Sequence, residues 1–282
     1  MSGRHTKPLP VPEAIEGSFV PSVEALRTLQ RVDGPDAETV HRARTSVRRL
    51  RSNVRVLEGH VEVASSLRAE LGWIGECLGT VRDLDVLTAR VAAAIDHLPE
   101  ELRIGGGAVF ATLGEERGSA DEHLRAAVSS QRFGDVIDEL DLLIKEASSS
   151  TGTLDASDVV RPTWRAMRDA VHGLDDPPSD DQLHDLRIEA KRARYAAELF
   201  SSVAGARGAR FVKRATALQD ALGAQHDAVR ACAWFLGHGG EDTGLARACG
   251  WFAAQAATER DASRTTWRPA WKSLRDQKAR FW

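Results

Sequence analysis

The stretch VHRARTSVRRLRSNVRVL, residues 40–57, decides how we expect this chain to fold. On a helix with about 100° between residues, its apolar positions form one strip and its basic positions form the strip beside it. The apolar strip is Ala43, Val47, Leu50, Val54 and Leu57, and the basic strip is His41, Arg44, Arg48, Arg51 and Arg55. No Asp or Glu interrupts the run, so no carboxylate one turn away neutralises these charges. We therefore expect an anion from elsewhere to bind them.

A second stretch, LHDLRIEAKRARYAAELF at residues 183–200, repeats this pattern. Its basic strip, with the same spacing, is His184, Arg187, Lys191 and Arg194. A second motif follows each basic segment: Leu78-Gly79 with Arg82-Asp83 after the first, and Leu222-Gly223 with His226-Asp227 after the second. Two pairs of matching segments in the same order indicate an internal repeat, and hence two homologous halves.

Helical spacing of apolar residues recurs along the chain, and no sustained alternating run of Val, Ile or Thr predicts a strand. We expect an all-α protein of two pseudo-symmetric antiparallel bundles, each resembling a four-helix bundle, around a basic groove. Residues 1–19 are predicted to be an arm that packs loosely or not at all, 20–147 the first bundle, 148–158 a linker and 159–282 the second bundle. Helices are predicted near residues 21–30, 35–59, 63–97, 109–128, 133–147, 159–174, 181–200, 206–236, 242–263 and 269–280.

Three local features carry specific predictions. Clustered glycines at 72, 75 and 79 lower helix propensity, which indicates that another helix packs very close there, with a local kink as the alternative. The run Gly105–Gly107 is interpreted as a break before the fourth helix. Asp180 or Asp181 is the expected N-cap of the second basic helix.

Composition restricts the class of protein. The net charge of −3 argues against a generally basic coat for nucleic acid, so any anion site must concentrate charge locally. Three cysteines, Cys77, Cys232 and Cys249, lack metal-type spacing and fit buried, reduced thiols in the cytosol. We find neither a signal-peptide core nor an apolar run of membrane-spanning length, and we expect a cytoplasmic protein.

The last segment, residues 265–282, interleaves Trp267, Trp271, Phe281 and Trp282 with Arg and Lys, Lys278 among them. Such a mixture can bind nucleic acid. At this spacing the aromatic residues more often dock a terminal helix on its bundle, and we favour that interpretation.

The paired basic strips indicate a polyanion-binding site. Guanidinium groups hydrogen-bond well to phosphate, and if a two-fold axis relates the halves, the strips face each other across a groove that suits a chain of negative charges. Two carboxylates near the strips, Asp83 and Asp227, together with Asp85 and Asp220, are expected to orient the guanidinium groups. Glu198 stands where the first strip has Arg55 and either caps the second strip or faces solvent.

His41 and His184 allow a second interpretation, a metal site shared with Asp83 and Asp227, although the surrounding arginines oppose a cation. For catalysis the sequence offers little, because it has no GxxxxGK[ST], HExxH or GxSxG motif. We therefore predict a non-enzymatic binding protein without cofactor or bound metal, and leave its oligomeric state open.

Four motifs in this order resemble the CHAD domain, the conserved histidine α-helical domain. They are the His-x-x-Arg pattern of residues 41–51, LGxxRDLDVL at 78–87, HxxRxxxKRxRY at 184–195 and LQDxLGxxxD at 218–227, and the closing Phe281-Trp282 is also similar. The sequence departs from the repeat at His226, which stands where the first half has Arg82, and at Glu198.

The resemblance implies binding of inorganic polyphosphate on a basic central surface, in some members at polyphosphate granules. It implies as ligands the residues of both strips except Arg55, with Arg82 as a further candidate; Arg55 is predicted from its place in the first strip alone. Such binding should weaken steeply with salt and strengthen at lower pH as histidines become charged. Two rivals remain: a helical protein that binds nucleic acid, which we favour less, and a metal-dependent phosphohydrolase that uses the His and Asp pairs.

Overall fold

The computed structural model describes residues 6–58, 62–63, 65–240, 242–276 and 280–282. Gly59, where the first basic helix was expected to stop, Lys278 and the first five residues of the arm lie outside the described residues. The elements in chain order are β1 (Leu9–Pro10), α1 (Val11–Ala14), a π-helical turn (Ile15–Phe19), α2 (Val20–Arg31), α3 (Ala37–Leu57), α4 (Leu67–Ala94), 3₁₀ turns (Ile95–His97 and Glu100–Leu102), α5 (Arg103–Val128), α6 (Gln131–Ser148), β2 (Thr153–Leu154), α7 (Ala156–His172), α8 (Asp180–Leu199), α9 (Gly205–Gly237), α10 (Thr243–Ser263) and α11 (Trp267–Leu274).

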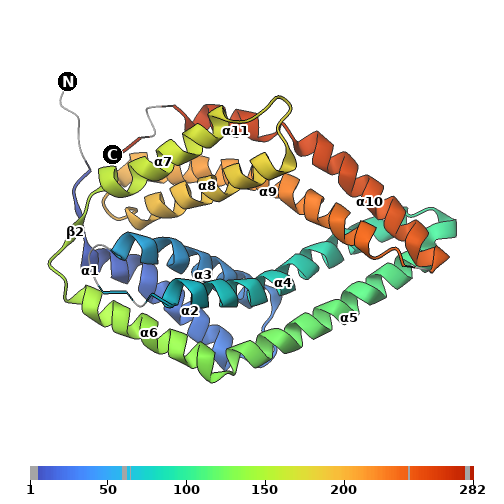
Figure 1. The fold of residues 1–282 in the computed structure, drawn as a ribbon, viewed down its shortest axis with the longest axis horizontal. Helices are drawn as coiled ribbons and strands as arrows, with labels where there is room; N and C mark the ends of the chain where they lie inside the picture. The colour runs from blue at the N-terminus through green and yellow to red at the C-terminus, as the bar shows by residue number, and fades with distance from the viewer. Residues whose placement is uncertain (1–5, 59–61, 64, 241, 277–279) are drawn as a thin grey trace.

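The helices form two layers, α1–α6 in one and α7–α11 in the other (Figure 1). The layers meet where α3 packs on α8, and again at the opposite end of the molecule, where α5 packs on α10. Within each layer the basic helix packs along the long helix that follows it, α3 on α4 and α8 on α9. This arrangement confirms the predicted all-α fold of two related helical halves.

The apolar strips of the basic helices form part of the core. Val40, Val47 and Val54 of α3 have no exposed surface, and the same holds for Leu186 and Ala190 of α8. Because these strips anchor both helices, the adjoining basic strips are held at the junction of the two layers.

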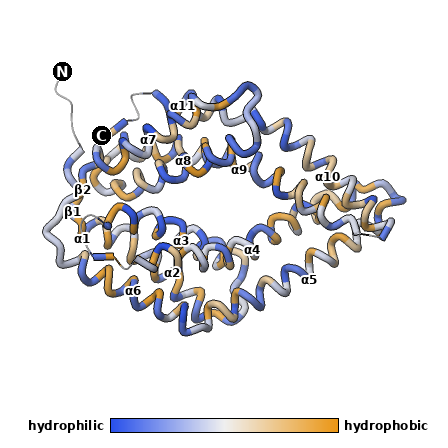
Figure 2. The backbone as a smooth tube through the Cα atoms, in the orientation of Figure 1, coloured by the Kyte–Doolittle hydropathy of each residue, from blue (hydrophilic) through white to orange (hydrophobic). Residues whose placement is uncertain are grey.

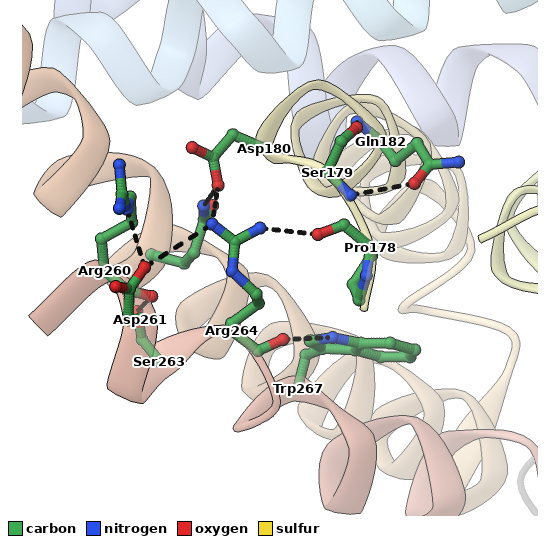
Figure 3. A network of polar contacts seen from close by, with 10 residues as sticks. Pro178, Ser179, Asp180, Gln182, Arg260, Asp261, Ser263, Arg264 and Trp267 are labelled. Carbon is green, nitrogen blue, oxygen red and sulfur yellow. Dashed lines mark hydrogen bonds and ion pairs between the residues drawn. The ribbon is translucent and has the colours of Figure 1, made fainter. Parts of the chain in front are cut away.

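The start of α8 is fixed by a capping box and by α10 (Figure 3). The N-cap is Ser179, so the expected Asp180 or Asp181 cap was wrong: the Ser179 hydroxyl accepts a hydrogen bond from the Gln182 N–H. Asp180 instead accepts one from Arg264, which also donates to the Pro178 carbonyl at 2.6 Å. Ser179 lies one residue outside the acidic pair, where its backbone is extended as an N-cap requires.

The N-terminal arm packs into the first half, which corrects the expectation of a loose segment. Leu9, Val11 and Phe19 are fully buried, and β1 pairs antiparallel with β2 of the linker. The apolar residues lack a helical period because the segment passes through a strand and a π-helical turn before α2. Burial rather than period holds the arm in place.

The run Gly105–Gly107 lies inside α5, so the predicted break was wrong. A Cβ on Gly105 would overlap the carbonyl oxygen of Gly244 on α10, and one on Gly106 would overlap the Leu98 side chain. Gly105 lets α5 approach α10, and Gly106 makes room for Leu98, so tertiary packing overrides their low helix propensity.

The last aromatic residues dock on the second half, as we favoured. Trp267, Trp271 and Phe281 are buried, and Trp271 stacks on Trp164 with ring centroids 5.4 Å apart. The helix that contains Trp267 and Trp271 ends at Leu274 rather than near residue 280. In the described part of the chain, none of the helices combines the length and apolarity that a bilayer crossing requires.

We predict that Gly105→Ala destabilises the protein by about 1–3 kcal/mol, because the added methyl group forces α5 away from α10. Gly107→Ala is the matched control, since a Cβ there meets nothing within 4 Å and should stabilise the helix by up to about 1 kcal/mol. Urea unfolding measures both. Equal stability of the two variants would contradict this account of the glycine run.

Candidate functional site

A cavity of about 560 Å³ lies where the two halves meet, and it gathers most of the predicted site residues. Those that line it are His41, Arg44, Arg48, Arg82, Asp83, His184, Arg187, Lys191 and Asp227. Figure 2 shows hydrophilic stretches of α3, α8 and α9 where the two layers face each other. The basic strips therefore converge, as the predicted dyad requires.

Two glycines make room for the arginines of this cavity. Arg44 lies beside Gly79 of α4, with 3.9 Å from its Nη2 to the position of a Cβ, and Arg187 lies beside Gly223 of α9 at 3.7 Å. Gly72 and Gly75 of α4 likewise face side chains of α3. This confirms the predicted close helix, and it explains why the Leu-Gly motif is present in both halves.

The centre of the cavity holds like charges close together. Burial and the neighbouring Arg44 and Arg187 lower the pKa of Arg48 to about 10. Burial, followed by the charges of Arg187, Arg48 and Arg44, lowers the pKa of Lys191 to about 7. Within the described ranges, no carboxylate lies within 4.0 Å of the cationic nitrogens of Arg48, Arg187 or Lys191. The Nε atom of Arg187 is buried, and no described residue forms a hydrogen bond with it. The site thus presents an unmet donor and positive charge that Asp83 and Asp227 offset only in part.

The two histidines of the second half contact each other. The Nδ1 atoms of His184 and His226 are 3.2 Å apart, so one ring donates and the other accepts, and the accepting ring is neutral. Burial and then Arg187 and His184 lower the pKa of His226 to about 3, which keeps this ring uncharged at neutral pH. His226 therefore contributes a hydrogen bond and no charge where the first half has Arg82.

Asp83 connects the two halves. Its carboxylate accepts from Arg44 of α3 at 3.1 Å and from Arg230 of α9 at 3.0 Å. This agrees with the predicted role of orienting a guanidinium group. Asp85 instead binds Arg117 of α5 at 2.7 Å. Asp220 is exposed and does not line the cavity.

Three residues of the predicted basic strips lie outside this cavity. Arg51 and Arg55 are exposed, whereas Arg194 donates to Gln219 at 2.9 Å and to Glu198 at 2.6 Å. Glu198 also pairs with Arg49 of the other half at 3.4 Å, so it caps the second strip rather than facing solvent. Any role of Arg51, Arg55 or Arg194 in binding stays a prediction.

Sequence reasoning missed a second group of cavity residues, which lie on α3, α4, α5 and α9. They are Thr45, Thr80, Leu84, Val86, Leu87, Glu116, Gln219, Arg230 and Trp234. Arg230 and Trp234 follow His226 at intervals of four, so they share its helix face, and this spacing could have revealed them. Glu116 carries no such signal, because it belongs to a helix outside the repeated motifs. Nowhere in the described ranges do three or more His, Cys, Asp or Glu side chains cluster as metal ligands.

A family model described as the CHAD domain matches residues 23–236. The chain belongs to the CHAD-domain family. Membership confirms the resemblance that the four sequence motifs carry, and the matched range contains every cavity residue of both basic strips.

Similar proteins span several organisms. The chain is 29% identical over 236 residues to the uncharacterized protein Rv2226 of Mycobacterium tuberculosis strain H37Rv, covering 79% of this CHAD chain and 45% of Rv2226. Protein MT2285 of strain CDC 1551 matches equally, so the chain spans about half the length of these relatives. Among solved structures, the CHAD domain from the plant Ricinus communis aligns with a TM-score of 0.76 at 23% identity, covering 96% of this chain and 94% of that one. PptA from Streptomyces chartreusis aligns with a TM-score of 0.74 at 20% identity, covering 94% and 100%. Both share the fold.

We predict that Lys191→Met stabilises the unliganded CHAD protein by about 1 kcal/mol or more at pH 6, because it removes a buried cation from among arginines. The folded amine has a pKa of about 7, against 10.5 as the ordinary value, so the unfolded chain binds the extra proton between these values. Stability of the parent relative to the variant should therefore rise with pH across that window. Urea unfolding at pH 6 and pH 9.5 measures both differences. Equal stability at pH 6 would contradict the charge crowding.

Proposed function

We propose that this CHAD protein binds inorganic polyphosphate in the cavity between its two halves, without catalysing a reaction. The observation that carries the proposal is the convergence of Arg44 and Arg48 of α3 with Arg187 and Lys191 of α8 on one cavity. A single phosphate needs two or three donors, whereas donors on opposite walls suit several phosphates in a row.

The charge balance supports a ligand with repeated negative charge. Arg44 is paired with Asp83. The charges of Arg48, Arg187 and Lys191 are offset only in part, by Asp83 and Asp227, and an external anion would compensate the remainder. A bound polyanion lowers the electrostatic cost of holding these groups together, and this gain adds to the release of counterions from the chain. Family membership agrees with the proposal, since the CHAD resemblance implies polyphosphate binding.

A competition titration tests the proposal. Labelled polyphosphate is bound to the protein at physiological salt and displaced with unlabelled polyphosphate or with single-stranded DNA or RNA of equal charge. We expect polyphosphate to compete at least tenfold better. Better competition by the nucleic acid would favour the first rival, and release of phosphate that requires an added divalent ion would favour a phosphohydrolase.

In the same assay, replacing Arg48 and Lys191 together with Ala should weaken polyphosphate binding at least a hundredfold. The plot of log affinity against log salt should also become shallower by about 1.4, since two cations no longer release counterions. The matched control is Arg165→Ala with Lys213→Ala, which removes two exposed cations outside the cavity. Equal losses in both double variants would place the site elsewhere.

Binding should weaken as pH rises from 6 to 8.5, because Lys191 loses its charge around pH 7 in the free protein. The groups that face this amine are Arg44, Arg48, Arg187 and Asp227. Lys191→Arg keeps the positive charge throughout this range, so its affinity should depend less on pH. Isothermal titration calorimetry at several pH values measures both. Parallel pH profiles of parent and variant would contradict a titrating Lys191.

A further inference from the structure

We propose that the same cavity takes a phosphate chain that ends in an aromatic base, with Trp234 and Glu116 as the base subsite. The ligand class is a nucleoside polyphosphate, a compound with several phosphates at one end and a flat ring carrying amino groups at the other. This inference rests on the proposed function, because the phosphates would occupy the cationic centre already described.

The first observation is where the internal symmetry fails. In the register that aligns Arg82 with His226, Val86 corresponds to Arg230 and Arg90 to Trp234. These changes all lie on one face of α9, while the basic residues of α3 and α8 that line the cavity match each other. An inorganic polyphosphate chain has two equivalent ends and gains nothing from a cavity whose ends differ. A ligand with unlike ends does.

The second observation is the chemistry of that end. Trp234 lines the cavity eight residues beyond His226, about 12 Å further along the helix axis. The apolar side chains of Leu84, Val86 and Leu87 on α4 line the same cavity. Indole and aliphatic side chains offer a phosphate group neither charge nor several hydrogen-bond donors, whereas a base stacks on an indole face.

The third observation is that Trp234 is held rigidly. Its Nε1 donates to Glu116 Oε2 at 2.9 Å, and its ring stacks on His238 with centroids 4.0 Å apart and planes 13° from parallel. His238 also contacts Glu116 Oε1 at 2.7 Å, and it does not line the cavity. His238 therefore supports the indole and the carboxylate from behind, so both are fixed before a ligand enters.

Glu116 supplies a hydrogen-bond acceptor beside the indole. Each of its oxygens has one protein partner, and a carboxylate can accept about four hydrogen bonds in all. The remaining lone pairs suit the amino group of adenine. Asp83 at the cationic centre is paired with two arginines, Arg44 and Arg230, whereas Glu116 contacts only an indole and an imidazole in the described residues, so its end of the cavity suits an amino group better than a phosphate.

The test compares ATP with inorganic tripolyphosphate in a buffer with EDTA, by calorimetry on the full chain. We expect ATP to bind the parent about tenfold more tightly, within the range that base stacking on an aromatic side chain provides. In Trp234→Leu the ratio of the two dissociation constants should fall close to one, and in Trp234→Phe, which keeps an aromatic face, it should stay well above one. Trp251→Leu is the matched control, because Trp251 lies on α10 outside the cavity, and its ratio should equal that of the parent.

Equal affinity of the parent for ATP and tripolyphosphate would overturn the base subsite and leave the proposed function standing. A preference for ATP that survives Trp234→Leu would also overturn it, as would tighter binding of a single-stranded oligonucleotide than of ATP in competition. Failure of the parent to bind tripolyphosphate, ATP and long polyphosphate alike would reject the proposed function itself. The comparison in the parent needs no variant, so the proposal can be tested even if Trp234→Leu does not fold.

Discussion

The structure depends on holding like charges together at the junction of α3 and α8. Arg48 and Lys191 come from opposite halves, yet Arg48 and Arg187 both lower the pKa of Lys191, and Arg187 also lowers that of Arg48. Such crowding opposes folding. It is tolerated because the apolar strip beside each basic strip is buried in its own half, and because Gly79 and Gly223 leave space for the guanidinium groups. The cost of folding and the capacity to bind an anion thus have the same origin.

Carboxylates in the molecule connect the halves without neutralising the centre. Asp83 joins α3 to α9 through Arg44 and Arg230, and Glu198 joins α8 to α3 through Arg49. Glu116 joins α5 to α9 at the far end of the cavity. These contacts surround the cationic groups and leave Arg48 and Lys191 available. The cavity is therefore maintained by interactions at its edges, and its charge remains for a ligand.

The sequence predicted the features that depend on local periodicity. Spacing along a helix determines which residues share a face, so the two basic strips, their apolar partners and the homologous halves could be predicted from 40–57 and 183–200. Contacts between distant segments could not. The strip of α3 predicts Arg48, Arg51 and Arg55 equally as site residues. Only the place where α3 crosses α8 determines that Arg48 alone of the three lines the cavity. Gly105 packs against Gly244 of α10, and Glu116 accepts a hydrogen bond from Trp234 of α9. The spacing of residues within α5 predicts neither contact. The buried arm was missed for the same reason, since its partner β2 lies in the linker.

The central claim is that one polyanion is bound by both halves at once. A crystal structure of the protein with a short inorganic polyphosphate tests it most directly. The account predicts phosphate oxygens within hydrogen-bond distance of Arg48 from α3 and of Lys191 from α8 along a single chain. Polyphosphate bound on the outer face of α7 and α11, with Arg48 and Lys191 touching no phosphate, would contradict it.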